Sequence, residues 1–286
     1  MDLFSNSEMP SLCLRDVKRT LAFREAIRRV VKPGDVVLDA GAGSGILSFF
    51  AAEAGAKRVF AVEFDKALSY RLRQNVELNE LGAVVEVVCA DVRSLKLPMA
   101  VDVVVAEMID TWMLDELQIP ALNALRASGT ITPATRMIPT RYAAYATWGH
   151  VDFNCYGFQV PFPTHDWPDL SEESGWYPLP FQALTEPIIV FDASFQDRVE
   201  QKFNERVTVT PTGTGDANVI RLSGLAYLTE SSPLAATQAF NGNKLLPIAP
   251  VRLAAGRPAT FFMSGYRGGR GGIEQALCRE EKGLAD

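Results

Sequence analysis

Residues 36–45 constrain the fold of this chain more than any other stretch. The apolar segment 36–38 leads into Asp39, and an apolar run typical of a helix begins at Ile46. Between them lie three glycines at alternate positions, Gly41, Gly43 and Gly45. A strand, a glycine turn and a helix form the nucleotide site of many α/β sheets, because glycine lets the backbone approach a ligand and the helix N-terminus offers free N–H groups.

The spacing of these glycines helps to select the ligand. A dinucleotide-binding fingerprint, G-x-G-x-x-G, would place its third glycine at position 46, where this chain has isoleucine. The third glycine falls one residue early, which favours an adenosine ligand without a pyrophosphate, such as S-adenosylmethionine, and disfavours a nicotinamide oxidoreductase. A glycine triplet is a weak signal by itself, so a tight turn that binds nothing is the alternative at this point.

Length and composition narrow the class of protein. With 286 residues the chain can hold one large domain or two modest ones, and its net charge of −6 disfavours non-specific binding of nucleic acid. The four cysteines form no C-x-x-C pair and are expected to be free thiols in a reducing compartment. With two histidines and no Cys/His cluster, no metal site is expected. No signal peptide and no apolar run of about 18 residues occur, which predicts a soluble, cytoplasmic protein without a membrane partner.

Helical and extended patterns alternate over the first half of the chain. The predicted helices are 15–30, 46–54 and 66–79, and the predicted strands are 36–40, 59–62, 84–89 and 101–106. This alternation predicts a parallel, Rossmann-like α/β sheet with right-handed crossovers. Ligands of such sheets bind beyond the carboxyl ends of the strands.

The pattern changes after about residue 130, where prolines interrupt any helix. Short β-like runs separated by turn signals take over, at 187–191, 206–210, 219–228 and 259–266. We therefore expect two domains: residues 1–139 as a nucleotide-binding Rossmann-like domain with an N-terminal helix, and residues 140–286 as a mostly antiparallel, barrel-like substrate domain with a short charged tail.

Each predicted strand of the sheet ends at an acidic residue: Asp39, Glu63, Asp91 and Glu107. Glu63, about 20 residues beyond the glycines, is predicted to accept hydrogen bonds from a ribose diol, with an N-cap of the next helix as the alternative. Asp91, together with Val92, is predicted at the adenine edge, with a turn or cap as the alternative. Asp39, in the predicted strand 36–40, is also predicted to be a cofactor-binding residue.

The acidic stretch 106–116 carries Glu107 and Glu116, nine residues apart. Here the chain resembles the protein arginine methyltransferases, in which two glutamates at this spacing follow the fourth strand and clamp the substrate guanidinium. Residues 14–20, 51–59 and 97–98 also match that family, and the resemblance is specific over about residues 10–142. It implies a class I S-adenosylmethionine-dependent methyltransferase with a barrel domain, S-adenosylhomocysteine as product, and Arg19 facing the methionine carboxylate of the cofactor.

The chemistry of the glutamate pair can be argued from the residues themselves. A guanidinium is planar, and its N–H groups form a fork that matches carboxylates bidentately. Two carboxylates can hold it and direct one nitrogen at a sulfonium methyl, so that transfer depends on positioning and electrostatics. An empty buried pair predicts a raised pKa for one glutamate. The alternative is that Glu116 is a surface acid.

Several residues depart from the family pattern. Asp110 and Thr111 replace a glycine and a tyrosine, which predicts a more cationic or differently shaped acceptor. The N-terminal helix with paired aromatic residues is largely missing, since only Phe4 precedes Met9, so the lid is expected to be short or different.

The histidine of the family's Thr-His-Trp barrel loop is also missing. The corresponding region, near residues 232–238, contains none. His165 comes too early in the chain to belong to that loop, and we expect it to be a loop residue of its own.

Two further features are open to more than one interpretation. Residues 267–272 resemble an RGG motif, but their place directly after a predicted strand favours a glycine turn that closes the barrel. Trp112 lies inside the acidic stretch and is a candidate contact for the acceptor, whereas core packing is expected of the remaining tryptophans, Trp148, Trp167 and Trp176.

The sequence therefore predicts an S-adenosylmethionine-dependent N-methyltransferase that acts on a guanidino group of a protein arginine or a related cationic acceptor. Transfer to another protein side chain or to a small-molecule amine or hydroxyl is one alternative, and a non-catalytic cofactor-binding module is another. The resemblance also implies a homodimer formed through an arm, for which residues 155–185 are the candidate.

Overall fold

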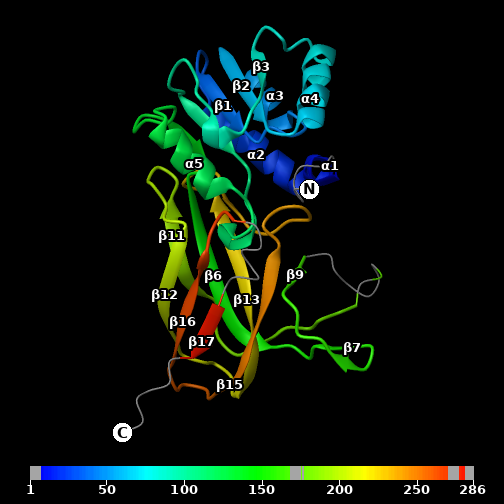
Figure 1. Ribbon diagram of the computed structural model, residues 1–286, viewed down its shortest axis with the longest axis vertical. Coiled ribbons are helices and arrows are strands. Elements are labelled where there is room, and N and C mark those ends of the chain that lie inside the picture. The colour runs from blue at the N-terminus through cyan, green and yellow to red at the C-terminus, as the bar shows by residue number, and fades with distance from the viewer. Residues whose placement is uncertain (1–7, 168–174, 176, 270–276, 281–286) are drawn as a thin grey trace.

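The computed structural model describes residues 8–167, 175, 177–269 and 277–280. Figure 1 shows a sheet flanked by helices at one end of the molecule and long strands at the other. Phe4, Trp176, residues 270–272 of the glycine-rich motif and most of the charged tail lie outside the described residues.

The first sheet is parallel and has the order β3-β2-β1-β4-β5. Its strands are β1 (Val36–Ala40), β2 (Arg58–Glu63), β3 (Val85–Cys89), β4 (Val103–Ala106) and β5 (Arg136–Ile138). The central strands are nearly continuous apolar runs and are buried, as expected of strands covered on both faces. The predicted Rossmann-like sheet is therefore confirmed.

Five helices are described in this half, and three of them agree closely with the helices predicted at 15–30, 46–54 and 66–79. They are α1 (Glu8–Arg15), α2 (Val17–Val30), α3 (Ile46–Glu53), α4 (Lys66–Leu78) and α5 (Gln118–Ala127). The single helix expected at 15–30 is wrong at its start, because Asp16 separates α1 from α2 and caps α2 by accepting a hydrogen bond from the Arg19 N–H at 3.0 Å. Helix α1 lies outside the predicted helix because its eight residues are too short a run to establish a helical period.

The second half is antiparallel and curled, as predicted. Its larger sheet joins β6 (Arg141–His150), β9 (Thr164–Asp166), β10 (Gln182–Ala183), β11 (Ile188–Ser194), β13 (Gly215–Tyr227), β14 (Pro233–Leu234) and β15 (Asn243–Leu253). A smaller sheet joins β12 (Lys202–Val209), β16 (Ala259–Tyr266) and β17 (Leu277–Glu280), and a hairpin pairs β7 (Asn154–Cys155) with β8 (Phe158–Gln159). The expectation that His165 is a loop residue is wrong, since it lies in β9 opposite Lys244 of β15.

One apolar core runs through both halves, from Leu38 of β1 to Phe261 of β16. The segment between β4 and α5, residues 107–117, lies where the parallel sheet meets the antiparallel strands. Among the residues that the structure describes, no helix combines the length and the apolar character needed to cross a bilayer.

Candidate functional site

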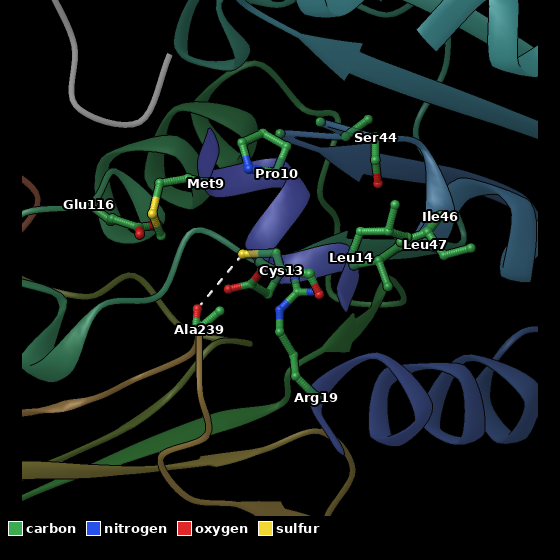
Figure 2. Close-up of a pocket in the computed structure, with 14 residues that line it drawn as sticks. Met9, Pro10, Cys13, Leu14, Arg19, Ser44, Ile46, Leu47, Glu116 and Ala239 are labelled. Carbon is green, nitrogen blue, oxygen red and sulfur yellow. Dashed lines mark hydrogen bonds and ion pairs between the residues drawn. The ribbon is translucent and has the colours of Figure 1, made fainter. Parts of the chain in front are cut away.

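A pocket opens at the carboxyl edge of the parallel sheet. Its wall comes from α1, the glycine turn, the start of α3 and the segment 107–116, which we call the acidic loop. The pocket encloses about 660 Å³ of non-atom space, part of it open to solvent. Figure 2 shows Met9 and Cys13 of α1 between Glu116 on one side and Ser44, Ile46 and Leu47 on the other.

The glycine turn forms one wall of the pocket. Gly41, Gly43 and Gly45 all have positive φ, at 80°, 51° and 90°, a region that glycine adopts without strain. A Cβ at Gly45 would lie 2.3 Å from Leu72 Cδ1, so this residue also permits close packing of α3 against α4. Helix α3 begins directly after the turn without a side-chain cap, and its first two residues line the pocket.

Two acidic residues that do not line the pocket form hydrogen bonds around the glycine turn. Asp39 is buried and accepts a hydrogen bond from Ser48 Oγ at 2.6 Å, and burial raises its pKa to about 6. Glu63 accepts from the Gly43 N–H at 2.9 Å and from the Asp65 N–H at 2.8 Å. The N-cap alternative for Glu63 is wrong, because Asp65 caps α4.

Asp91 and Val92 lie further along the same edge. Asp91 caps a 3₁₀ turn, Val92–Ser94, by accepting from the Arg93 N–H at 2.8 Å, and it pairs with the Arg93 guanidinium at 2.7 Å. This pairing lowers the pKa of Asp91. Val92 is buried in the core.

Only some of the predicted cofactor-binding residues reach the pocket. Arg19, Gly41 and Gly43 line it. Residues that are not part of its lining are Asp39, Gly45, Glu63, Asp91 and Val92.

Arg19 connects the glycine-turn side of the pocket to the acidic loop. Its Nη2 pairs with Glu107 Oε2, its Nη1 donates to the Cys13 carbonyl at 3.2 Å, and its buried Nε has no hydrogen-bond partner among the described residues. The Arg19 side chain is only 5% exposed, and this burial lowers its pKa. Arg19 thus brings one satisfied ion pair and one unsatisfied donor to the pocket.

Glu116 has the most perturbed carboxyl group of the pocket. Burial, with the nearby Asp110 charge, raises its pKa to about 8, against the opposing effects of Lys244 and Arg19. The raised pKa predicted for one glutamate of the pair is that of Glu116, whereas Glu107 forms an ion pair with Arg19. The interpretation of Glu116 as a surface acid is wrong, since it lines the pocket.

Residues of the antiparallel half form ion pairs and hydrogen bonds with the acidic loop. Lys244 of β15, 1% exposed, donates to Asp110 at 2.5 Å and to Asp115 at 2.6 Å. The N–H groups of Gly268 and Gly269 donate to the Met113 and Leu114 carbonyls at 2.7 and 3.1 Å. Asp110 is thus engaged by Lys244 within the protein, and the more cationic or differently shaped acceptor expected from Asp110 and Thr111 stays a prediction. The described part of the glycine-rich motif is a turn after β16, as favoured above.

Trp112, a candidate contact for the acceptor, anchors the loop in the antiparallel sheet and does not line the pocket. It is 1% exposed, and its indole N–H donates to the carbonyls of Tyr145 and Ser223 at 3.0 and 3.1 Å. Its backbone N–H donates to Tyr142 Oη at 2.9 Å. Trp112 and Met113 both have positive φ, 62° and 54°, a costly conformation that persists only where such surrounding contacts enforce it.

An aspartate contacts the barrel loop that lacks the expected histidine. Asp16 Oδ2 accepts from Thr237 Oγ1 at 2.5 Å and from the Ala239 N–H at 2.9 Å. Cys13 of α1 donates to the Ala239 carbonyl at 3.7 Å, the contact drawn in Figure 2. These contacts attach α1 and α2 to the barrel loop and close one side of the pocket.

Several of these residues are not among those predicted from the sequence. Asp16 carries a recognisable signal, an aspartate directly before a helical run. Met9, Pro10 and Cys13 line the pocket from α1, a helix that was not predicted, and Pro10 in its first turn is a signal of a helix start. Lys244 carries no signal, because nothing local distinguishes a buried lysine from a surface one.

Neither a disulfide bond nor a metal-binding group is found among the described residues. The cysteines are unpaired, as expected: Cys13, Cys89, Cys155 and Cys278. Within the described ranges, no group of three or more His, Cys, Asp or Glu side chains could hold a metal ion.

Comparison with known proteins relates this architecture to methyltransferases. Residues 17–132 match the family model of the TRM5/TYW2 methyltransferase domain. The chain is 34% identical over 128 residues to an uncharacterized protein of Methanocaldococcus jannaschii, covering 45% of this chain and 49% of that protein. It is 35% identical over 129 residues to the probable histone-arginine methyltransferase CARMER of Drosophila melanogaster, covering 44% of this chain and 24% of the relative. The match thus spans less than half the length of either relative.

Solved structures resemble the whole chain. Trypanosoma brucei PRMT1, in an enzyme-prozyme heterotetrameric complex with AdoHcy, superposes with a TM-score of 0.76 at 19% identity, covering 99% of this chain and 96% of the other. Arabidopsis thaliana protein arginine methyltransferase 10 gives 0.74 at 18% identity, covering 99% and 95%. These comparisons confirm the predicted resemblance to the protein arginine methyltransferases and the predicted two-part fold.

Proposed function

We propose that this chain is an S-adenosylmethionine-dependent methyltransferase that methylates a guanidino group, with a protein arginine as the favoured acceptor. The observation that carries the proposal is the shared pocket, which brings together the glycine turn, Arg19, Glu107 and Glu116. The likeness to arginine methyltransferases in fold and in the first half of the sequence supports it.

The residues present suit the cofactor. The unpartnered Nε of Arg19 is a buried donor suited to the methionine carboxylate, and the uncapped start of α3 offers further N–H groups. We assign Glu63 to the ribose, Asp91 and Val92 to the adenine edge, and Asp39 with the three glycines to the shape of the turn. When bound, the cofactor supplies an electrophilic methyl group on its sulfonium.

Glu107 and Glu116 are the proposed acceptor clamp. Once Arg19 turns to the cofactor carboxylate, Glu107 is free to accept from a guanidinium. Burial raises the pKa of Glu116 to about 8, so this carboxyl group is mostly protonated at neutral pH before an acceptor binds. Binding of a guanidinium favours release of that proton to solvent, and the ionised pair then orients one terminal nitrogen and stabilises the cation.

A titration and one substitution test this proposal. Calorimetric titration should show S-adenosylmethionine binding, and its absence would overturn the whole proposal. Glu116→Gln should keep the cofactor Kd within about threefold and lower turnover by at least about 100-fold, since one transition-state contact is lost. Glu53→Gln on the exposed face of α3 is the matched control and should behave like the wild type.

Two alternative functions are compatible with the same pocket. A different acceptor, such as another side chain or a small amine, would keep cofactor binding and Glu116 dependence but give a different methylated product by mass spectrometry. A non-catalytic module would bind the cofactor without any product. The match to the TRM5/TYW2 domain favours the cofactor fold without naming the acceptor, and the chain's net charge of −6 disfavours a nucleic-acid acceptor.

We also propose a division into residues 1–139 and 140–286 and self-association of the chain. The division is supported by β5, the last strand of the parallel sheet, and β6, which begins the antiparallel sheet. Self-association is supported by the β7–β8 hairpin and the segment after it, which expose Tyr156, Phe158 and Phe162 by 82%, 73% and 66%. Four unpaired cysteines support a cytoplasmic location.

A further inference from the structure

The acidic loop contains a buried ion cluster made of Lys244, Asp110 and Asp115. Lys244 Nζ donates to one carboxylate oxygen of each aspartate, at 2.5 and 2.6 Å, and no more than 19% of any of the three side chains is exposed. Lys244 therefore bridges two carboxylates that would otherwise repel each other, and it offsets one of their two negative charges. Buried charges that lose their partner are strongly destabilising, so the geometry of this loop depends on Lys244.

Asp110 links Lys244 to the backbone of Glu116 through hydrogen bonds. Its Oδ1 accepts from the Glu116 N–H and its Oδ2 from the Asp115 N–H, both at 3.1 Å. The path from Lys244 to the backbone of Glu116 is thus two hydrogen bonds long. No comparable contact of the described residues fixes the Glu116 carboxylate itself, which reaches the pocket.

We propose that Lys244 is a positioning residue for Glu116, acting through Asp110. The proposal rests on the proposed function for its catalytic consequence, although its structural part does not. Lys244 also sets the charge offered to the acceptor: with Asp110 and Asp115 engaged by Lys244, the side chains left to bind the acceptor are Glu107 and Glu116. The clamp then suits a single guanidinium rather than a cluster of cations.

Amide hydrogen exchange tests the structural part without requiring methyl transfer. In Lys244→Met, which keeps the length of the side chain and removes its charge, the amides of Asp115 and Glu116 should exchange at least about tenfold faster. The amides of Gly268 and Gly269, which bind the same loop through Met113 and Leu114, should change much less. Equal acceleration in both segments, or none in the acidic loop, would overturn the proposal.

A second variant separates the charge effect from lost packing. In Lys244→Met/Asp110→Asn, the amide oxygen still accepts from the Glu116 N–H, whereas the NH₂ group replaces the acceptor of the Asp115 N–H and can donate only to the Asp115 carboxylate. Exchange at Glu116 should therefore return at least halfway to the wild-type rate. A double variant no better than the single one contradicts the mechanism, because it would mean that the lysine acts through its bulk.

Kinetics test the catalytic part. Lys244→Met should lower kcat/KM for the acceptor by about 100-fold while the cofactor Kd stays within about threefold, with Lys202→Met on the exposed side of β12 as the control. If exchange responds as expected and kcat/KM does not, Lys244 holds the loop without serving the clamp. If the wild type methylates no guanidino acceptor at all, the proposed function fails while the exchange result still stands.

Discussion

At the scale of single residues, Glu107 and Asp110 are each held by a cation that lies far away in the sequence. The nine-residue spacing of Glu107 and Glu116 placed both in one pocket, and the glycines formed the expected turn. The partners came from far along the chain: Arg19 for Glu107 and Lys244 for Asp110. A carboxylate's local sequence does not reveal which distant cation will share its burial.

The raised pKa of Glu116 predicts how acceptor use depends on pH. Only the ionised carboxylate attracts a guanidinium, so kcat/KM for the acceptor should rise with pH up to about 8 and level off above it. The cofactor Kd should show no matching rise. A flat acceptor profile between pH 6 and 9 would contradict the assignment of Glu116 to the clamp.

The same group predicts how stability depends on pH. Its pKa is about 8 in the folded chain and near the usual 4.5 when unfolded, so the folded state binds more protons in between. Glu116 therefore lowers the free energy of unfolding progressively as pH rises from about 4.5 to 8. Glu116→Gln should become more stable relative to the wild type over that window, measured by urea unfolding at pH 5, 7 and 9. A constant difference would show that the pKa is not shifted.

At the scale of elements, the central strands and α2 to α4 were predictable because apolar periodicity marks them. Helix α1 is too short to establish a helical period, and β6 is buried at most positions and so lacks the alternation of a half-buried strand. Elements whose role is to cover a pocket or to cross a curled sheet are stabilised by partners elsewhere in the chain. Their own sequence then carries little of the signal.

The junction between β1 and α3 gives a test at this scale. Gly45→Ala should destabilise the fold by about 2–4 kcal/mol, because it combines a strained positive φ with a Cβ 2.3 Å from Leu72 Cδ1. Gly34→Ala has a similar φ of 94° but nothing within 4 Å, and should cost only about 1 kcal/mol. Urea unfolding of both variants measures the difference, and equal costs would mean that the packing of α3 on α4 is not limiting.

At the scale of the whole molecule, the predicted succession of a parallel sheet and a curled antiparallel sheet is confirmed. The contacts between the two halves could not be predicted. Lys244, Tyr142 and the turn at Gly268 belong to the antiparallel half, and they bind the acidic loop of the parallel half. The boundary between the halves therefore runs through the proposed acceptor site.

The exposed aromatic hairpin yields a prediction about assembly. If Tyr156 and Phe158 pack against a second copy, the double variant Tyr156→Ser/Phe158→Ser should shift the chain towards the monomer in light scattering at micromolar concentration. Leu78→Ser, which alters an 81%-exposed side chain at the end of α4, is the control and should leave the mass unchanged. A wild-type chain that is already monomeric at these concentrations would contradict the proposed self-association.

The long reach of the contacts around the acidic loop has a consequence for folding order. The bonds that shape the glycine turn join residues 9 and 20 positions apart, whereas Lys244 meets Asp110 and Asp115 across 134 and 129 positions. Short loops close before long ones. A nascent or partly folded chain would complete the turn while its glutamate pair is still unoriented. If the chain methylates an acceptor as proposed, its acceptor site is then completed later in folding than its glycine turn.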